Sequence, residues 1–470
     1  MIKQLTINIS YILFLFVTIS SCDNSGNNHL KEYVYKKDPA FRYEIVETFS
    51  GDGWKEYYIK MVSGTWLTER EVNHTEWWHW ITIVVPNNVV ETEALLMIGG
   101  GSSKDQEPRK ASEILINAAL GTNSIIAEIS NIPFQPLNYA NDTKDDRYED
   151  DLIAYGWKKF LEHGAKDEDV SWLARLPMTR AVVKGMDVIQ KVTSDFKITI
   201  DKFVVAGASK RGWTTWTTAV VDNRVIAIIP IVIDLLNVIP SFDHHWRCYG
   251  EWSPAIDDYV NEGITEWMGS KEYDRLLELV EPYSFIDQLQ IPKFLINATG
   301  DEFFVTDSWR FYWESLIGNK YLQYVPNGNH GLTGTYNPES LIAFYNAIIT
   351  DSDIPKFNWY VSNDSIYLNI NTDANYTVKS WEAINENTRD FRVAVIGKSW
   401  KSNKINTTSN DKYYLHVSKP KTGYKAGLLE ITIESGSKVP FVFTTGTLVS
   451  PNSYPFMPFK PKVPKGKRIK

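Results

Sequence analysis

The chain has 470 residues, 43% hydrophobic and 23% charged, and these proportions exclude a disordered polymer, a collagen and a bundle of membrane spans. Acidic residues outnumber basic ones by 57 to 49, so the net charge of −8 does not favour phosphate backbones and we expect no nucleic-acid partner. At about 150 residues per domain, the length predicts two or three domains.

The first 21 residues have the pattern of an export signal. Lys3 precedes an apolar run at residues 11–19, which is too short to span a bilayer as a mature helix. Ile19-Ser20-Ser21-Cys22 resembles the lipobox of bacterial lipoproteins, in which the cysteine becomes the acylated first residue. The alternative is an ordinary signal peptide with a chance cysteine. We expect lipidation at Cys22, a lipid-anchored protein of the cell envelope, and Cys248 without a disulfide partner.

Residues 22–39 are expected to be a flexible tether, because they begin with a polar stretch that cannot bury apolar area. Strands and helices then alternate. Strands are predicted near residues 57–62, 80–85, 94–98, 124–129, 203–206, 226–233, 294–296 and 321–325, and helices near 111–119, 149–163 and 177–193. This alternation indicates an α/β sheet with right-handed crossovers, in a domain of residues 40–354.

Two later segments depart from the alternation. Residues 240–290 are rich in aromatics and contain a helical run, so they predict a cap inserted over the edge of the sheet. Residues 355–460 lack helical periodicity, and short strands near 366–370, 391–395 and 428–433 predict a β-sandwich-like domain. The basic, proline-containing residues 461–470 predict a disordered tail.

The most informative motif is Gly207-Ala208-Ser209, directly after a predicted strand. It is typical of a nucleophile elbow, a tight strand-to-helix turn that lifts a serine hydroxyl above the sheet and needs a small residue such as Gly207 before the serine. The usual second glycine is replaced by Arg211, and glycine follows only at position 212. Taken alone, Gly-x-Ser after a strand is also a common turn.

Two residues on later loops complete a candidate triad. Asp301 follows the predicted strand at 294–296, and His330 follows the one at 321–325. The order Ser…Asp…His is that of α/β-hydrolases. We expect His330 to accept the Ser209 proton and Asp301 to orient the imidazole, although each alone could be a helix cap or a loop residue.

An oxyanion hole is expected beside the triad. The elbow places the Lys210 N–H, and a second N–H is expected from Gly100 or Gly101, unless these glycines form a simple turn. Arg211 is expected either to face a substrate carboxylate or to pair with an acid, and Trp213 is a candidate substrate contact. Asp145-Asp146 and Glu149-Asp150-Asp151 are interpreted as a solvated helix start.

Other clusters predict less. His244 and His245 are adjacent, so they favour cap packing or substrate contact over zinc; a metal-dependent esterase using them is the minor hypothesis. Glu76-Trp77-Trp78-His79-Trp80 could be a sugar platform, but tryptophan in a strand is more often core. No phosphate loop or dinucleotide fingerprint is present, and we expect no metal and no cofactor.

Motifs spread over residues 40–460 resemble a known family. They are Thr65-Trp66-Leu67-Thr68, Glu76-Trp77-Trp78-His79-Trp80 with Ile81-Thr82-Ile83-Val84-Val85-Pro86, Ile98-Gly99-Gly100-Gly101, Tyr155-Gly156-Trp157, Ala174-Arg175-Leu176-Pro177-Met178, Gly207-Ala208-Ser209-Lys210-Arg211-Gly212-Trp213, Asp234-Leu235-Leu236-Asn237, His244-His245, Tyr249-Gly250 and Gly300-Asp301-Glu302-Phe303-Phe304. In these motifs the chain is similar to the PhoPQ-activated pathogenicity-related proteins. The resemblance implies an α/β-hydrolase fold, export and, by name, an association with virulence regulation, but no settled substrate.

The sequence therefore predicts an exported, lipid-anchored serine hydrolase that forms an acyl-enzyme at Ser209. The expected substrate is an ester or a peptide with an aromatic or sugar portion. The alternative is a hydrolase scaffold reused as a non-catalytic surface binding or signalling protein, because fold does not fix function. The sequence leaves the oligomeric state open.

Overall fold

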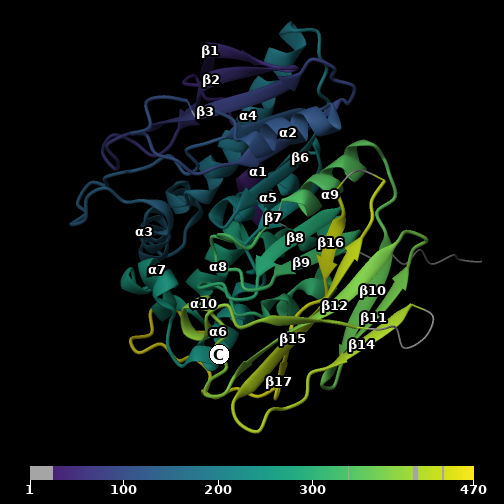
Figure 1. Cartoon of the computed structure of the whole chain (residues 1–470). Helices are drawn as coiled ribbons and strands as arrows, with labels where there is room; N and C mark the ends of the chain where they lie inside the picture. The colour runs from purple at the N-terminus through teal and green to yellow at the C-terminus, as the bar shows by residue number, and fades with distance from the viewer. Residues whose placement is uncertain (1–24, 109, 337, 406–410, 437–438, 470) are drawn as a thin grey trace, which may run out of the picture.

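The structure is a computed structural model that describes residues 25–108, 110–336, 338–405, 411–436 and 439–469. The predicted export signal and Cys22 lie outside the described residues. Figure 1 shows a long twisted sheet with helices on both faces and a second body of antiparallel strands beside it. Among the described residues, no helix is both long and apolar enough to cross a bilayer.

The central sheet has nine strands in the order β1-β2-β3-β5-β4-β6-β7-β8-β9. Their bounds are β1 Arg42–Gly51, β2 Trp54–Thr65, β3 Glu76–Pro86, β4 Glu93–Ile98, β5 Ile125–Ile129, β6 Lys202–Ala208, β7 Val225–Ile231, β8 Lys293–Ala298 and β9 Lys320–Val325. The first three strands pair antiparallel, as do β3 and β5, and the remaining pairs are parallel. An antiparallel edge, a parallel remainder and the crossed-over order β5-β4 make this an α/β-hydrolase fold, as predicted.

Side-chain alternation divides the helices between the two faces of the sheet. Leu96 and Val205 belong to the same buried cluster as residues of α4 (Arg175–Asp195) and α5 (Lys210–Val221). Leu95 and Val204 belong instead to the cluster of α2 (Glu113–Thr122) and α9 (Glu339–Ile349), which lie on the nearer face in Figure 1. Because both faces are covered, β4, β6 and β8 are apolar along almost their whole length.

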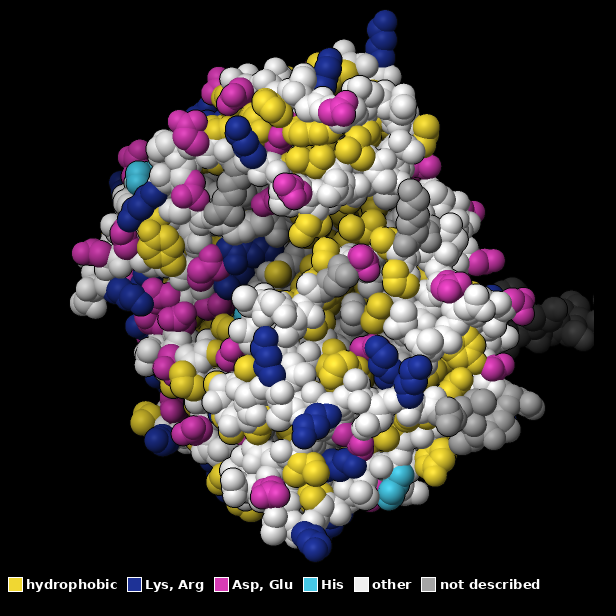
Figure 2. Space-filling model, in the orientation of Figure 1, with side chains coloured by type: hydrophobic (Ala, Val, Ile, Leu, Met, Phe, Trp, Pro, Cys, Tyr) yellow, Lys and Arg dark blue, Asp and Glu magenta, His cyan; other side chains and the backbone are white. Residues whose placement is uncertain are grey.

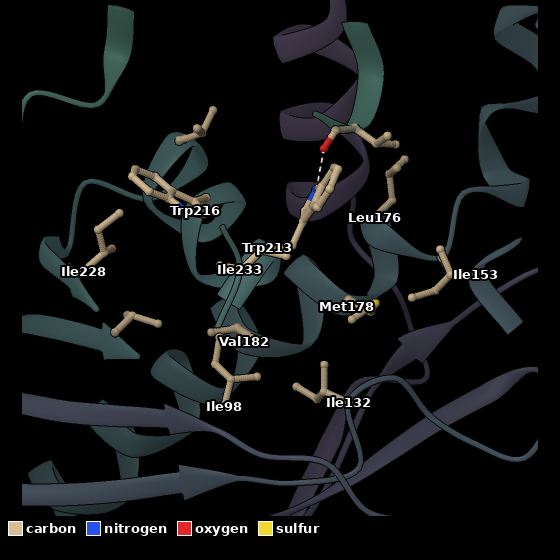
Figure 3. Close-up of a cluster of buried hydrophobic side chains, with 14 of the residues drawn as sticks. Ile98, Ile132, Ile153, Leu176, Met178, Val182, Trp213, Trp216, Ile228 and Ile233 are labelled. Atoms are coloured by element: carbon tan, nitrogen blue, oxygen red, sulfur yellow. Dashed lines mark hydrogen bonds between the residues drawn. The ribbon is translucent and has the colours of Figure 1, made fainter. Parts of the chain in front are cut away.

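The tryptophans of α5 are part of this core. Figure 3 shows Trp213 and Trp216 among aliphatic side chains of α4 and the sheet, and their exposed fractions are 2% and 1%. The indole Nε1–H of Trp213 donates to the Val280 carbonyl at 2.7 Å. A buried ring with its polar atom satisfied stabilises the junction between α5 and the helical insertion.

That insertion lies between β7 and β8, where the sequence predicts a cap. It contains α6 (Val238–Tyr249), α7 (Asp257–Asn261) and α8 (Lys271–Val280), with the 3-10 turns Pro254–Ile256, Ile264–Trp267 and Pro282–Gln288. The cap packs on α3 (Glu149–Glu162), which is preceded by a long loop and followed by the 3-10 turn Asp167–Trp172.

The prediction of a flexible tether at 22–39 is wrong over the described part of that segment. Residues Ser25–Tyr35 form a helix, α1, which packs on α4, α5 and α8. Leu30 and Val34, one turn apart, are 2% and 0% exposed, and the Tyr35 hydroxyl donates to the Val221 carbonyl at 2.8 Å. The polar residues at its start conceal this short apolar stripe.

The prediction of a disordered tail at 461–470 is also wrong over residues 461–469. The Lys465 N–H donates to the Glu266 carbonyl at 2.9 Å, and the Lys467 carbonyl accepts from the Lys271 N–H at 2.9 Å. The tail is ordered because backbone and carboxylate groups of the cap, near the start of α8, form hydrogen bonds with its backbone. The composition of the tail does not reveal these partners.

The C-terminal domain is built from two antiparallel sheets, so the predicted β domain is present. One contains β10 (Lys356–Ser362), β11 (Ser365–Asn371) and β14 (Lys412–His416), and the other contains β13 (Lys401–Lys404), β12 (Tyr376–Asn385), β15 (Tyr424–Ile433) and β16 (Phe441–Thr444), with β17 (Leu448–Ser450) paired to β15. The predicted strand at 391–395 is wrong, because Val393–Ile396 form a helical turn, α10. The Asp390 carboxylate accepts from the Arg392 N–H at 3.0 Å and turns the chain there.

Candidate active site

Ser209 lies between the end of β6 and the start of α5, in a backbone conformation that few non-glycine residues adopt. Its φ and ψ are 58° and −124°, and its N–H donates to the Ile231 carbonyl at 2.8 Å. A Cβ at Gly207 would lie 2.7 Å from the Arg211 carbonyl oxygen, so the turn has room only for glycine there. This geometry is that of a nucleophile elbow, and it raises the Ser209 hydroxyl at the carboxyl edge of the sheet.

Asp301 and His330 come from the loops after β8 and β9, which are neighbouring parallel strands. The structure brings both to Ser209: His330 Nε2 lies 2.8 Å from Ser209 Oγ, and His330 Nδ1 lies 2.8 Å from Asp301 Oδ2. Asp301 is 3% exposed. With the imidazole proton on Nδ1, facing Asp301, Nε2 is the acceptor for the Ser209 hydroxyl.

Two residues of the Asp301 loop hold this arrangement and were not singled out from the sequence. The Phe303 N–H donates to Asp301 Oδ1 at 2.7 Å, and the Phe303 ring lies 4.2 Å from the His330 ring, centroid to centroid. Glu302 Oε2 accepts from the His330 N–H at 2.7 Å. Both follow Asp301 directly in one of the family motifs, and that adjacency is the signal that could have found them.

A narrow cavity of about 50 Å³ opens beside Ser209. Its lining combines core side chains, among them Trp213 and Ile233, with side chains of the cap. The cap contributes Phe242, Ile256, Tyr259, Ile264, Met268 and Tyr273. Trp213, the expected substrate contact, lines the cavity. Most of the lining is apolar, and Asp150, Arg175, Lys210 and Thr265 are polar residues in it besides Ser209.

Arg175, which sequence reasoning missed, is a buried cation at the edge of the cavity. Its Nη1 donates to the Lys210 carbonyl at 2.9 Å, and its guanidinium lies 4.6 Å from the Trp213 ring centroid. Burial lowers its pKa, and the charges of Tyr259 and Asp150 oppose that shift. Arg175 thus ties α4 to the elbow directly behind Ser209.

The expected oxyanion donors lie on two segments, the start of α5 and the glycine loop after β4. Lys210 is the first residue of α5, where backbone N–H groups have no partner within the helix. Gly101 has a φ of +149°, and a Cβ there would lie 3.1 Å from the Asn131 nitrogen. A Cβ at Gly100 would lie 2.8 Å from Arg211 Nη2, so the glycine loop borders α5 closely.

The prediction that Arg211 faces substrate is wrong. Its guanidinium forms a bidentate pair with Glu149, with both N–O distances 2.6 Å, and it does not line the cavity. Burial raises the pKa of Glu149, but hydrogen bonds and charges from Arg211 and Lys210 outweigh burial and lower that pKa to about 2. Glu149, interpreted from the sequence as part of a solvated helix start, is instead bound in an ion pair. For Arg211, the alternative of pairing with an acid is the one that holds.

Of the two alternatives for His244 and His245, cap packing is the one that holds, because both side chains are buried and neither lines the cavity. His244 Nε2 lies 2.9 Å from Asp307 Oδ1, and its Nδ1 lies 2.8 Å from the Tyr454 hydroxyl. His245 Nε2 accepts from the Ser253 N–H at 3.0 Å, and burial lowers its pKa to about 3. Among the described residues, no group of three or more His, Cys, Asp or Glu could hold a metal ion.

The aromatic stretch in β3 is mainly core. Trp77 and Trp80 are 1% and 5% exposed, and His79 is fully buried between Ser63 Oγ and the Asn131 carbonyl oxygen.

Cys248, a buried free thiol, accepts from Arg389 Nη1 at 2.8 Å.

Comparisons with known proteins place the chain in a family. The sequence model of the PhoPQ-activated pathogenicity-related protein family matches residues 30–392. The chain belongs to this family. It is also 34% identical to autocrine proliferation repressor protein A of Dictyostelium discoideum over 472 residues, covering 94% of each chain.

Similar solved structures include three esterases. Acetyl xylan esterase from Paenibacillus sp. R4 has a TM-score of 0.49 and 12% identity over 70% of this chain and 94% of that chain. Acetyl xylan esterase 1 from Thermoanaerobacterium sp. has a TM-score of 0.44 and 12% identity over 65% of this chain and 87% of that chain. Glucuronoyl esterase from Solibacter usitatus has a TM-score of 0.39 and 11% identity over 68% of this chain and 91% of that chain. The α/β-hydrolase fold of this chain follows from its own strand order.

Proposed function

We propose that this protein is a serine hydrolase that cleaves a carboxylic ester through an acyl-enzyme at Ser209. The observation that carries the proposal is the hydrogen-bonded series Asp301–His330–Ser209, with the serine on a strained elbow at the carboxyl edge of the sheet. Three side chains distant in sequence share this edge with an apolar cavity that opens beside the hydroxyl.

The proposed reaction has two half-steps. Ser209 Oγ attacks the ester carbonyl carbon while His330 Nε2 accepts the hydroxyl proton, and the alcohol then leaves with that proton as the C–O bond breaks. Water, deprotonated by His330, attacks the acyl-serine, and Ser209 regains a proton as the carboxylic acid departs. Asp301 stabilises the imidazolium in both steps, and the Lys210 N–H with one N–H of the glycine loop binds the oxyanion.

The cavity favours a short acyl group. At about 50 Å³ it is small, and its mostly apolar lining offers few hydrogen bonds to a longer polar chain. The ester form is preferred to the peptide form in this proposal because the cavity beside Ser209 is small and offers few polar partners to a peptide chain.

A fluorophosphonate probe tests the proposal. We expect covalent label on the wild-type protein and none on Ser209→Ala, with p-nitrophenyl acetate hydrolysed faster than the octanoate ester or an acyl p-nitroanilide. Wild-type protein that takes no label under conditions where a known serine esterase does would refute the serine mechanism. Faster anilide cleavage would make it a peptidase.

A second candidate is a surface signalling or binding protein on the same scaffold. The name of the relative from Dictyostelium discoideum, a proliferation repressor, favours it. Under this alternative, binding to cells survives Ser209→Ala and no probe label forms. Under the hydrolase proposal, the label and the turnover disappear together.

We also propose that the protein is exported and lipid-anchored through Cys22, on the basis of the lipobox-like residues. Incorporation of a radiolabelled fatty acid into the full chain, and its loss in Cys22→Ala, tests this. Wild-type protein that takes up no label and fractionates with soluble proteins would overturn it.

A further inference from the structure

The residue that replaces the usual second glycine of the elbow has three directed contacts. Arg211 Nε–H donates to the Ile132 carbonyl at 2.5 Å, and Nη1 and Nη2 donate to the two carboxylate oxygens of Glu149. A bidentate guanidinium–carboxylate pair fixes direction as well as distance. Arg211 therefore joins the start of α5 to two segments that are more than 60 residues away in sequence.

Glu149 is bound from a second side by Gln135. The Glu149 N–H donates to Gln135 Oε1 at 2.7 Å, and Gln135 Nε2 donates to Glu149 Oε1 at 2.6 Å. The same Nε2 donates to the Gly101 carbonyl at 2.8 Å. Lys210 Nζ lies 2.9 Å from Glu149 Oε2, so both residues that follow Ser209 are tied to this one carboxylate.

The glycine loop is held at its other residues by the chain around Asn131. The Asn131 N–H donates to the Gly100 carbonyl at 3.0 Å, and the Ile132 N–H donates to the Gly99 carbonyl at 3.3 Å. Arg211 meets this segment again through the Ile132 carbonyl and through its close approach to Gly100. The carbonyls of the loop are thus held, and the loop cannot shift without breaking these contacts.

We propose that Glu149, Arg211 and Gln135 form a clamp that fixes the glycine loop, residues 99–101, against the nucleophile elbow. The proposal rests on the proposed serine hydrolase function. The three are positioning residues: none touches the reacting atoms, and they act by keeping the loop N–H and the Lys210 N–H aimed at one oxyanion. Such donors accelerate a reaction only when they are fixed before the charge develops, and a shift of about 1 Å can cost roughly 100-fold in rate.

The clamp also accounts for the departure from the elbow motif. A glycine at position 211 would leave the Glu149 carboxylate with Lys210 as its cation and Gln135 as a neutral donor, and would remove the contact to the Ile132 carbonyl. The dense mixture of acidic and basic side chains over α3 and α7, on the left of Figure 2, shows that this side of the molecule is held by ion pairs.

The test compares Arg211→Met, which keeps length but loses the fork, with Arg211→Lys, which keeps only the charge. We expect Arg211→Met to lower kcat for p-nitrophenyl acetate by 10- to 100-fold with KM within about twofold, and to slow fluorophosphonate labelling equally. Arg211→Lys should recover part of the loss. Gln135→Met, which frees the Gly101 carbonyl and leaves the ion pair, should lower kcat in the same way.

Arg224→Met is the matched control. Arg224 forms a similar forked pair with Asp222 at the far end of α5, with contacts of 2.6–3.2 Å. We expect this variant to lose thermal stability and to keep wild-type kcat. Equal losses of kcat in Arg211→Met and Arg224→Met would reduce the clamp to a structural ion pair and overturn the inference.

The failures of the two proposals are distinguishable. A wild-type protein without probe label refutes the serine hydrolase itself. A wild-type protein that labels and turns over, together with an Arg211→Met protein that does so at the same rate, leaves the hydrolase standing and refutes the clamp.

Discussion

Two guanidinium–carboxylate pairs in this molecule have the same local geometry and different surroundings. The clamp pair, Arg211 and Glu149, has side chains that are 11% and 37% exposed. The pair of Arg389 and Asp307, with side chains 1% and 3% exposed, lies at the junction of the C-terminal domain, the core and the cap, where His244 also binds Asp307. Water can replace a lost partner in the clamp but not at the junction.

The comparison separates residues that hold a reacting geometry from residues that hold the domains together. At the junction, burial raises the pKa of Asp307, but Arg389 and His244 outweigh burial and hold that pKa well below its usual range. Both carboxylates are thus stabilised in the charged form. The two pairs differ in whether water can solvate the carboxylate after its arginine is removed.

The largest expected effect is that of Ser209→Ala, which should lower kcat by roughly 10⁶-fold because the nucleophile is gone. The melting temperature is expected to stay close to that of the wild type, since the substitution removes one hydrogen bond of a partly exposed hydroxyl, the one to His330 Nε2. Steady-state kinetics and thermal unfolding on the same preparation check both. A large drop in melting temperature in Ser209→Ala would instead indicate that Ser209 has a structural role.

Arg389→Met is expected to lower the free energy of unfolding by about 3–5 kcal/mol, because buried Asp307 loses its bidentate cation and keeps, of its arginine contacts, only the longer one to Arg310 at 3.3 Å. Urea unfolding measures this. The kcat of the protein that remains folded should be unchanged, because the pair does not reach the cavity. A loss below about 1 kcal/mol would show that the junction is as accessible to water as the clamp.

The clamp should make a pH-dependent contribution to stability. The pKa of Glu149 is about 2 in the folded protein and ordinarily about 4.5, so the stabilisation is fully present above pH 4.5 and is lost as the pH falls toward 2. The partial exposure of Glu149 limits it to less than about 1 kcal/mol. The stability difference between wild type and Glu149→Gln, measured from pH 6 to pH 3, should shrink with acid. A constant difference would mean that another group carries it.

A similarly small effect is expected from removing residues 461–470. Their backbone contacts with the cap are near the surface, so we expect a loss of about 1 kcal/mol and unchanged kcat. Thermal unfolding of the truncated protein checks this. A change in kcat would instead connect the tail to the cap residues that line the cavity.

The sequence predicts the parallel strands of the central sheet well because they are almost uniformly apolar and are followed by glycine, as after Ile98 and Ala206. It does not predict β1, whose side chains are mostly exposed. It also predicts which strand ends carry Ser209, Asp301 and His330, because chain order and the α/β-hydrolase topology bring those ends to one edge. Local pattern and chain order are sufficient for these features. The catalytic roles of the three side chains stay a prediction until the probe experiment.

The sequence does not predict the features that depend on partners far along the chain. Glu149 resembles a solvated helix start, and only the packing of α3 against α5 pairs it with Arg211 and Lys210. Val393–Ile396 has the β-branched composition of a strand, but the Val393 N–H donates to the Gly300 carbonyl and the segment turns. The substrate contact considered for His244 is absent for the same reason, because both ring nitrogens are hydrogen-bonded to the distant residues Asp307 and Tyr454.

The position of α1 has a consequence for the setting in which the molecule would work. Its first residue, Ser25, comes three residues after Cys22, a length of chain that spans at most about 11 Å. The lipid proposed for Cys22 would thus keep the folded body close to the bilayer surface. The cavity would then meet molecules that lie at that membrane, and the proposed hydrolase would act on those.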